Sequence, residues 1–376
     1  MRIALFLVIA LLLFLPFNWL AYRQLVRIHP RRRRWILPAL VLGNLMWPFF
    51  PLLRSFTDFA RITRAIFGPL WFGWTVLTLL YSLLLFVVLL AWIPFHRRMT
   101  FARFARWPSR VFLVTGAIAC VIGYYQAIVP LRVERVPIRI ANLPAAADGM
   151  KIALLGDLHV GLFTRPSRLQ TIFATTARLH PDVVLLAGDM IDDDPHFVPK
   201  LLAGTSALPP STPVYGVLGN HEMYGDPLLA IERLEGSRIR LLMNEGTAMR
   251  GIWIAGVSDP AARDAAQQQP RLLPNLTRAL HGRPAAMLPI VVAHQPKILD
   301  DALREHVPLV LTAHTHGGQF GIRPLGWSLA GVFLRYHMGL YAIGGTQLYI
   351  NTGTGYWLFP FRLGMTPEIT LIELQR

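Results

Sequence analysis

The stretch VYGVLGNHEMYG, Val214–Gly225, places an apolar run directly beside three polar side chains of different chemistry. The run before Gly219 has the continuous apolar composition of a strand that is covered on both faces. Asn220, His221 and Glu222 follow it at once. Ligands of open α/β sheets bind beyond the carboxyl ends of the strands, so the stretch predicts a buried strand that ends at a functional edge.

Four more apolar runs end in the same manner. They read GDLHVG with Asp157 and His159, AGDMID with Asp189 and Asp192, VVAHQP with His294, and LTAHTHGGQ with His314 and His316. Residues i and i+2 of an extended chain point to one face, so each closely spaced pair can address the same ion. Glycines beside these residues allow sharp turns and a close approach of the backbone.

The donor set favours two metal ions rather than one. Two Asp, one Asn and four His supply seven nitrogen and oxygen ligands, more than one first-row ion needs, whereas two ions that share one carboxylate account for them all. Imidazole with carboxylate and carbonyl oxygen suits Mn, Zn or Fe. Taken alone, Asp189 is equally a helix cap and GNHE a turn, but five such clusters at five strand ends favour a dimetal site.

The second half of the chain has the pattern of an α/β domain. Apolar runs recur with helix-like stretches between them, as in PSRLQTIFATTARL, which argues for sheets with helices on the outside. The strand candidates are KIALLG, PDVVLLAG, VYGVLG, RIRLLM, GIWIAGV, LPIVVAH, VPLVLTAH, QLYIN and EITLIEL. VPIRI is a further short strand candidate ahead of them.

The first half of the chain is different in both hydropathy and charge. Residues 1–150 hold 18 Arg, no Lys and three acidic residues, whereas the remainder holds 19 basic and 18 acidic residues. Nearly all of the net charge of +16 therefore lies in the apolar half, which argues against a nucleic-acid-binding surface on the globular half. The single cysteine, Cys120, excludes a disulfide framework or a cysteine metal site within one chain.

Four segments are long and apolar enough to cross a bilayer as helices: 4–21, 35–53, 69–95 and 111–130. Short loops rich in Arg stay in the cytoplasm, and loops 22–34 and 96–110 carry six and five Arg. We therefore expect a multi-pass protein of the bacterial inner membrane with its globular domain in the periplasm. If segment 35–53 does not span, that side is reversed.

GDLHVG, GDMID, GNHE, Ala293–His294 and HTHGGQ occur in the order found in the calcineurin-like metallophosphoesterases, and residues 150–376 resemble that family. The tail YINTGTGYWLFPFRLGMTPEITLIEL resembles a bacterial, often membrane-tethered branch with phosphodiesterase-like enzymes and UDP-diacylglucosamine hydrolases. The resemblance implies a four-layer αββα sandwich. The expected organisation is a membrane region at 1–130, a linker at 131–149 and the metallophosphoesterase domain at 150–376.

The resemblance also assigns roles. It implies that Asp157, His159 and His316 bind one metal, that Asn220, His294 and His314 bind the other, and that Asp189 bridges them. His221 is then a catalytic residue that faces the substrate. We hypothesise that a metal-bridging hydroxide attacks phosphorus while His221 donates a proton to the leaving oxygen. Glu222 is expected to support the loop, Asp192 to orient a histidine or form a turn, and Tyr356 and Arg362 to be structural or to touch substrate.

These patterns leave three readings open. The favoured one is a membrane-anchored hydrolase of a phosphoester or pyrophosphate, with a lipid-linked compound as one candidate substrate. A cytoplasmic-facing UDP-diacylglucosamine-type hydrolase requires the opposite topology. A transporter or sensor with a regulatory phosphoesterase-like domain lacks support, because the four predicted spans contain no Asp, Glu or Lys. The sequence leaves the oligomeric state open.

Overall fold

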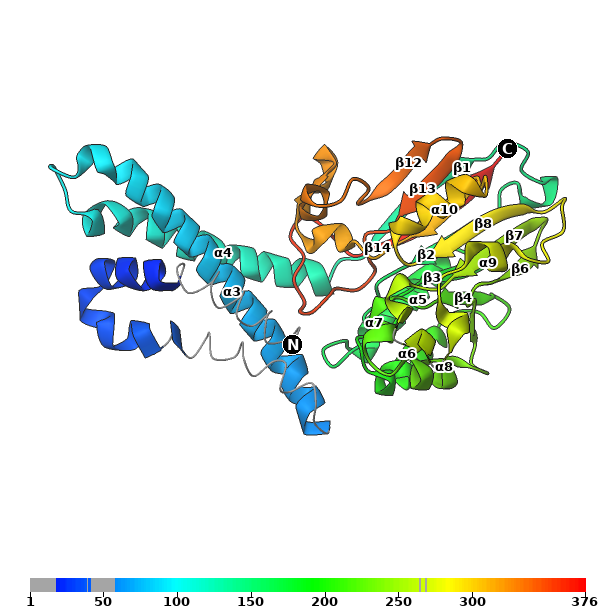
Figure 1. Cartoon of the computed structure of the whole chain (residues 1–376), viewed down its shortest axis with the longest axis horizontal. Helices are drawn as coiled ribbons and strands as arrows, with labels where there is room; N and C mark the ends of the chain where they lie inside the picture. The colour runs from blue at the N-terminus through cyan, green and yellow to red at the C-terminus, as the bar shows by residue number, and fades with distance from the viewer. Residues whose placement is uncertain (1–17, 39, 42–57, 264, 268) are drawn as a thin grey trace. The chain divides into compact units, whose positions relative to one another are not determined.

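The computed structural model of the chain describes residues 18–38, 40–41, 58–263, 265–267 and 269–376. These divide into two compact units, Met1–Val121 and Ile122–Arg376. The predicted spans 4–21 and 35–53 lie largely outside the described residues. The other two predicted spans are described, and Figure 1 shows the helices that contain them.

Among the described residues, two helices are long and apolar enough to cross a membrane. The first window, Val76–Phe95, lies in α3 (Asp58–Trp92) and the short 3₁₀ turn η3 (Ile93–Phe95), and has a mean hydropathy of 2.7. The second is α4 (Phe101–Ile128), with a mean hydropathy of 1.8. Only 22% and 11% of these windows are buried, so neither resembles the core helix of a soluble domain. The expected loop 96–110 is shorter than predicted, because α4 already begins at Phe101.

The globular unit is built on two six-stranded sheets. In sheet one the strand order is β1-β14-β2-β3-β4-β5, and β2 to β5 run parallel. The strands of sheet one are β1 (Arg132–Arg139), β2 (Lys151–Leu155), β3 (Val183–Ala187), β4 (Val214–Val217), β5 (Ile239–Leu241) and β14 (Glu368–Gln375).

Sheet two has the order β12-β13-β9-β8-β7-β6, with β7, β8, β9 and β13 parallel and an antiparallel strand at each edge. Its strands are β6 (Glu245–Met249), β7 (Ile252–Val257), β8 (Leu288–Ala293), β9 (Leu309–Thr312), β12 (Gly339–Ile343) and β13 (Thr346–Ile350). A two-stranded hairpin of β10 (Gly321–Ile322) and β11 (Trp327–Ser328) lies between β9 and β12 in the chain.

Three apolar cores stack these elements into helix, sheet, sheet and helix layers (Figure 1). The central core joins the inner faces of the two sheets, for example through Leu185 and Ile290. On the outer face of sheet one pack α5 (Pro166–Arg178), α6 (Val198–Thr205) and α8 (Pro227–Leu234). On the outer face of sheet two pack α9 (Leu276–Leu280) and α10 (Leu299–Arg304). The predicted mixed α/β architecture is therefore confirmed, whereas the four predicted membrane helices are not.

Segment 131–149, which was expected to be a linker with a short strand at VPIRI, contributes an eight-residue strand. All eight residues of β1 pair in parallel with β14, from Arg132 opposite Glu368 to Arg139 opposite Gln375. A short 3₁₀ turn, η4 (Ala145–Ala147), then leads into β2. The polar residues that made the segment look like a linker are on an edge strand, where one side of the backbone faces solvent.

Candidate metal centre

The polar residues at the strand ends come together at one edge of the molecule. β2, β3 and β4 are parallel neighbours in sheet one, and β8 and β9 are parallel neighbours in sheet two. Their carboxyl ends lead directly into the residues of the five sequence clusters. Since the two sheets pack face to face, these ten or so residues meet where the central core ends.

Five of the seven candidate ligands have a left-handed backbone. The φ angles are 52° at Asp157, 43° at His159, 48° at Asp189, 73° at His314 and 51° at His316. Such angles are uncommon outside glycine, and they cluster at functional sites. Left-handed residues thus turn the chain sharply after β2, β3 and β9, and one of them is Asp189. Next to it, Gly188 has a φ of 81°, and a Cβ atom there would come within 2.6 Å of the ring of His294.

The first cluster joins the exits of β2 and β9. His159 Nε2 lies 3.0 Å from His316 Nε2, and Asp157 Oδ1 lies 3.8 Å from the same atom of His316. All three side chains are buried. Asp157 also accepts hydrogen bonds from the backbone N–H of His314, at 3.1 Å to each carboxylate oxygen, which ties the two strand exits together.

The second cluster joins the exits of β3, β4, β8 and β9. His294 Nε2 lies 3.0 Å from Asn220 Oδ1, 3.1 Å from Asp189 Oδ2 and 3.1 Å from His314 Nδ1. The other ring nitrogen of His294 donates to the carbonyl of Ala187 at 2.8 Å. That hydrogen bond leaves Nε2 of the neutral ring with a lone pair directed at the cluster, as metal-binding histidines require.

One oxygen belongs to both clusters. Asp189 Oδ2 is 3.6 Å from His159 Nε2 and 3.1 Å from His294 Nε2. Around it converge carboxylate oxygens, an amide oxygen and imidazole nitrogens, almost all of them acceptors. Acceptors packed this closely in a buried site need protons or cations between them, so the donor set fits two metal ions with a shared carboxylate.

The histidines of the two clusters differ in pKa. Burial and the charge on His294 lower the pKa of His314 to about 4, and burial, His159 and Arg362 lower that of His316 well below its usual range. Burial lowers the pKa of His294 too, but Asp189 and Asp157 outweigh it and raise the value to about 10. His314 and His316 are thus neutral at pH 7, the form that binds metals, whereas His294 holds a proton that a bound cation displaces.

Glu222 braces the second cluster from behind. Its buried carboxylate accepts hydrogen bonds from the backbone N–H of Gly219 at 2.7 Å, of Asp189 at 3.1 Å and of Ile191 at 3.0 Å. It thereby fixes the β3 and β4 exits to each other, which is the supporting role expected of it. Burial and the neighbouring Asp189 raise the pKa of Glu222 to about 7.

His221 borders both clusters, and its ring forms a further possible ligand group with His159 and Asp189. Its backbone N–H donates to Asp189 Oδ1 at 2.8 Å, and one ring nitrogen lies within 4.8 Å of the ligand atoms of His159 and Asp189. Its Nδ1 is 2.7 Å from Asp193 Oδ1 and 3.5 Å from Asp192 Oδ1. Burial lowers its pKa, but these two carboxylates outweigh burial and raise it to about 11.

Asp192 has the orienting position that was one of its two expected roles. Its Oδ1 is 3.7 Å from His159 Nδ1 as well as close to His221. Asp193 was not singled out from the sequence, because the run DDD after a strand looks like an ordinary polar turn. The signal that marks it is structural, namely its contact with His221 Nδ1.

Arg362 and Tyr356 are built into the wall of the centre. The guanidinium of Arg362 is fully buried and donates to the backbone carbonyls of Gly355, Thr352 and Met365, at 2.8, 2.8 and 3.1 Å. Its Nη2 lies 3.1 Å from His316 Nδ1. Tyr356 is half-buried, and burial raises its pKa to about 12. Arg362 therefore has the structural role rather than contact with substrate.

A strand end that the sequence did not flag also reaches this edge. Ser258 and Asp259 follow β7, and among the described residues Ser258 Oγ and Asp259 Oδ2 have no hydrogen-bond partner although both are buried. A hollow of about 480 Å³ is lined by Ser258 and His294, and its charged side chains are Arg263, Lys297, Asp300, Asp301 and Arg304. The sequence GVSDP resembles a simple turn, which is why it escaped notice.

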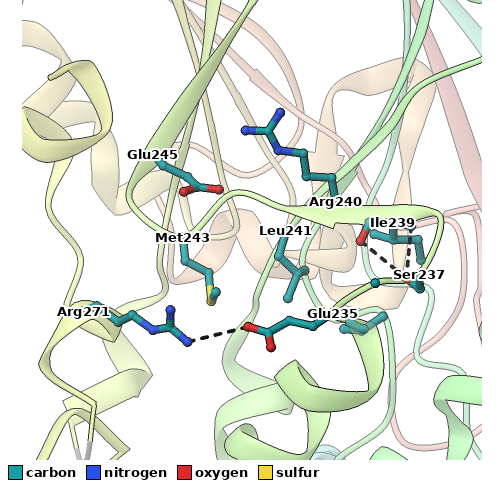
Figure 2. A pocket seen from close by; sticks show the side chains of 10 residues that line it. Glu235, Ser237, Ile239, Arg240, Leu241, Met243, Glu245 and Arg271 are labelled. Carbon is teal, nitrogen blue, oxygen red and sulfur yellow. Dashed lines mark hydrogen bonds and ion pairs between the residues drawn. The ribbon is translucent and has the colours of Figure 1, made fainter. Parts of the chain in front are cut away.

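A second hollow lies away from the metal clusters. It has a volume of about 330 Å³ and is lined by the end of α8, β5 and the approach to β6. Figure 2 shows Glu235 and Arg271 facing each other across it, 3.7 Å apart, with Arg240 and Glu245 nearby. The charged side chains that line this second hollow are of both signs and exposed, and none of the candidate metal ligands lines it.

Comparison with known proteins agrees with this geometry. Residues 150–318 match the family model of the calcineurin-like phosphoesterases. The chain has a calcineurin-like phosphoesterase domain. The match covers the strand ends of both clusters, and it confirms the predicted enzyme class, a metal-dependent phosphoester hydrolase.

Relatives with this phosphoesterase domain occur in bacteria and animals. The chain is 31% identical to a transmembrane protein with metallophosphoesterase domain of Danio rerio, over 70% of this chain and 62% of that protein. It is 28% identical to an uncharacterized metallophosphoesterase of Helicobacter pylori, over 89% of this chain and 96% of that protein. It is 29% identical to phosphodiesterase YaeI of Escherichia coli, over 69% of this chain and 95% of that protein. The chain thus spans less than two thirds of the Danio rerio protein, and almost all of the two bacterial ones.

Proposed function

We propose that the chain is a membrane-anchored phosphoesterase that uses two metal ions to hydrolyse a phosphodiester or pyrophosphate bond. The observation that carries the proposal is the shared oxygen, Asp189 Oδ2, which lies 3.6 Å and 3.1 Å from one histidine of each cluster. Asp157, His159 and His316 would hold one ion, and Asn220, His294 and His314 the other. Two bound cations supply charge neutralisation and an acidified water for attack on phosphorus.

The groups of the protein have separate tasks in this proposal. Glu222 and Asp157 hold the strand exits at fixed positions through backbone hydrogen bonds. His221 donates a proton to the leaving oxygen, since Asp193 and Asp192 both occupy Nδ1 and leave Nε2 for proton transfer. Such general acid catalysis contributes about 10²–10⁴-fold to the rate.

The substrate is an anion that enters over the exit of β8. The hollow beside His294 is lined by Arg263, Lys297 and Arg304 and by Asp300 and Asp301, and Asp301 pairs with Arg304. The lining thus has one more cationic than anionic side chain, which favours a phosphorylated ligand. The name of phosphodiesterase YaeI supports a diester rather than a monoester. A lipid-linked phosphoester fits an enzyme that carries long apolar helices of its own.

The proposed location is a bacterial inner membrane with the catalytic domain in the periplasm. The arginine-rich loops 22–34 and 96–110 support this side, because such loops remain cytoplasmic. A reporter enzyme fused after residue 140 tests it. Reporter activity restricted to the cytoplasm would reverse the orientation and make a nucleotide-linked lipid the better substrate candidate.

The catalytic proposal is tested with the purified full chain in detergent, stripped of metal and reloaded with Mn²⁺ or Zn²⁺. We expect hydrolysis of bis-nitrophenyl phosphate, faster than that of the monoester, in proportion to bound metal up to two ions per chain. The control variant Asp148→Ala should bind metal and hydrolyse the diester like the unmodified chain. Asp148 is an exposed carboxylate ahead of β2, at the opposite end of the strand from Asp157. Firm binding of two ions without hydrolysis of either ester would contradict the proposal.

A further inference from the structure

We propose that residues Phe320–Leu334, together with Trp357, form a surface that inserts into the lipid bilayer beside the end of α4, so that the metal centre opens toward phospholipid headgroups. We call this set the interfacial surface. The surface itself is independent of the proposed catalytic function, whereas its use to reach a lipid phosphoester rests on that function.

The interfacial surface concentrates apolar side chains that face solvent. Eight large apolar residues are exposed within the fifteen positions 320–334, whereas only six are exposed in the rest of the described chain between 131 and 376. Phe333 is 80% exposed and Leu325 75%. Single exposed apolar residues are ordinary, but a contiguous group of this kind marks a site of interaction.

The surface is fastened to the loop that carries two candidate metal ligands. It begins directly after η10 (His316–Gln319), and the backbone N–H of Leu329 donates to the carbonyl of Phe320 at 2.8 Å. Thr315, between His314 and His316, donates its hydroxyl to the carbonyl of His337 at 2.7 Å. The interfacial surface is therefore continuous in the chain with the loop that carries His314 and His316.

The same surface is joined to the end of the second membrane-type helix. Residues 122–128 of α4 belong to the globular unit. The backbone N–H of Arg362 donates to the carbonyl of Gly123 at 2.9 Å, and that of Gly364 donates to Gln126 Oε1 at 2.8 Å. The tail loop, which holds Arg362 and Gly364, also contacts η10, because the backbone N–H of Leu363 donates to the carbonyl of Gln319 at 2.8 Å. Figure 1 shows the tail loop reaching the end of α4.

Residue types on both sides of this connection match a membrane–water interface. Tyr124 and Tyr125 at the end of α4 are exposed, as are Trp327 and Trp357. Tyrosine and tryptophan are enriched where a bilayer meets water. Sequence 306–367 contains no acidic residue, and the exposed Arg335 follows the surface directly, which suits anionic headgroups. Continuity with a membrane-type helix favours a bilayer over a second copy of the chain.

The test places a polarity-sensitive fluorophore on the full chain. In a Cys120→Ser background, Phe333→Cys is labelled with a nitrobenzoxadiazole dye and the protein is reconstituted into phosphatidylcholine–phosphatidylglycerol vesicles. The matched control is Leu273→Cys, an exposed leucine of the same domain outside the surface. We expect the dye at 333 to emit at shorter wavelength and to lose roughly half of its emission when nitroxide-labelled lipids are included. The dye at 273 should do neither.

Equal behaviour of the two labelled positions would overturn the proposal. A shift to shorter wavelength at 333 without quenching by lipid would also overturn it, because protein rather than bilayer would then cover the surface. Neither result depends on catalysis, so the proposal survives or fails apart from the enzymatic activity.

A kinetic test addresses the use of the surface. The double variant Leu325→Glu and Phe333→Glu should hydrolyse a vesicle-embedded phosphodiester roughly tenfold more slowly, since charge replaces apolar side chains that anchor in lipid. Its rate on soluble bis-nitrophenyl phosphate should equal that of the unmodified chain. Leu340→Glu, at an exposed leucine of β12 that lies outside both the surface and the hollow beside His294, serves as control. Equal loss on both substrates would contradict a role in reaching lipid.

Discussion

Replacement of Glu222 by Ala should loosen the metal centre although Glu222 binds no metal in our proposal. The carboxylate accepts three backbone hydrogen bonds, from Gly219, Asp189 and Ile191, at 2.7, 3.1 and 3.0 Å. Alanine leaves all three N–H groups buried without an acceptor. Glutamine retains the shape but offers only one oxygen, so one N–H group then faces the amide NH₂.

The size of the effect follows from that count. A buried donor left without a partner costs about 1–3 kcal/mol. Three such donors in Glu222→Ala give about 3–9 kcal/mol, and the one lost in Glu222→Gln gives about 1–3 kcal/mol. At roughly 2–4 °C per kcal/mol for a domain of this size, Glu222→Ala should lower the unfolding temperature by at least about 6 °C.

The measurement is thermal unfolding of the full chain in detergent, with bound metal determined by elemental analysis. Glu235→Ala, at an exposed glutamate just after α8, is the matched control and should change neither quantity. We expect Glu222→Ala to lose metal, because Asp189 no longer has a fixed backbone position. An unfolding temperature and metal content equal to those of the control would refute the reasoning.

Replacement of His221 by Ala should lower turnover about 10²–10⁴-fold while metal content stays near wild type, and metal loss would refute its placement outside the ligand set. Asp189→Ala should reduce metal at both sites together; elemental analysis that finds one full site would argue against a shared carboxylate. Asp193→Asn removes a carboxylate that raises the pKa of His221, so the fall of activity with rising pH should move to lower pH. An unmoved pH profile would exclude Asp193 as the partner of His221. Chelation should abolish hydrolysis, and added Mn²⁺ or Zn²⁺ should restore it.

The sequence predicted those parts of the fold whose local signals agree with their surroundings. β2, β3 and β8 are continuous apolar runs because both faces of each strand are covered, and the abrupt change to Asp, Asn and His marks their ends. β6, with the sequence EGTAM, lies on a sheet edge and is only partly buried. Its mixed composition carries no strand pattern, so it was not predicted.

Local sequence is equally silent about partners that come from far along the chain. Asp193 acquires its significance from His221, and the buried guanidinium of Arg362 from carbonyls that meet only in the folded protein. Only the second half of β1 was predicted, as the short strand VPIRI within a linker, because its partner, β14, is more than 200 residues away. The donor types of the centre are visible in the sequence, whereas the groups that position them depend on tertiary contacts.

The place of β14 has a consequence for biosynthesis. β1 and β2 are close in sequence, yet β14 lies between them and pairs with both. Until residues 368–375 leave the ribosome, each of these strands exposes an open hydrogen-bonding edge, and such edges invite association with other chains. Membrane insertion of α3 and α4 would by then be long complete. If the chain is membrane-anchored as proposed, its phosphoesterase domain waits at the membrane in an incomplete state, so its yield should depend on chaperones of the compartment in which it folds.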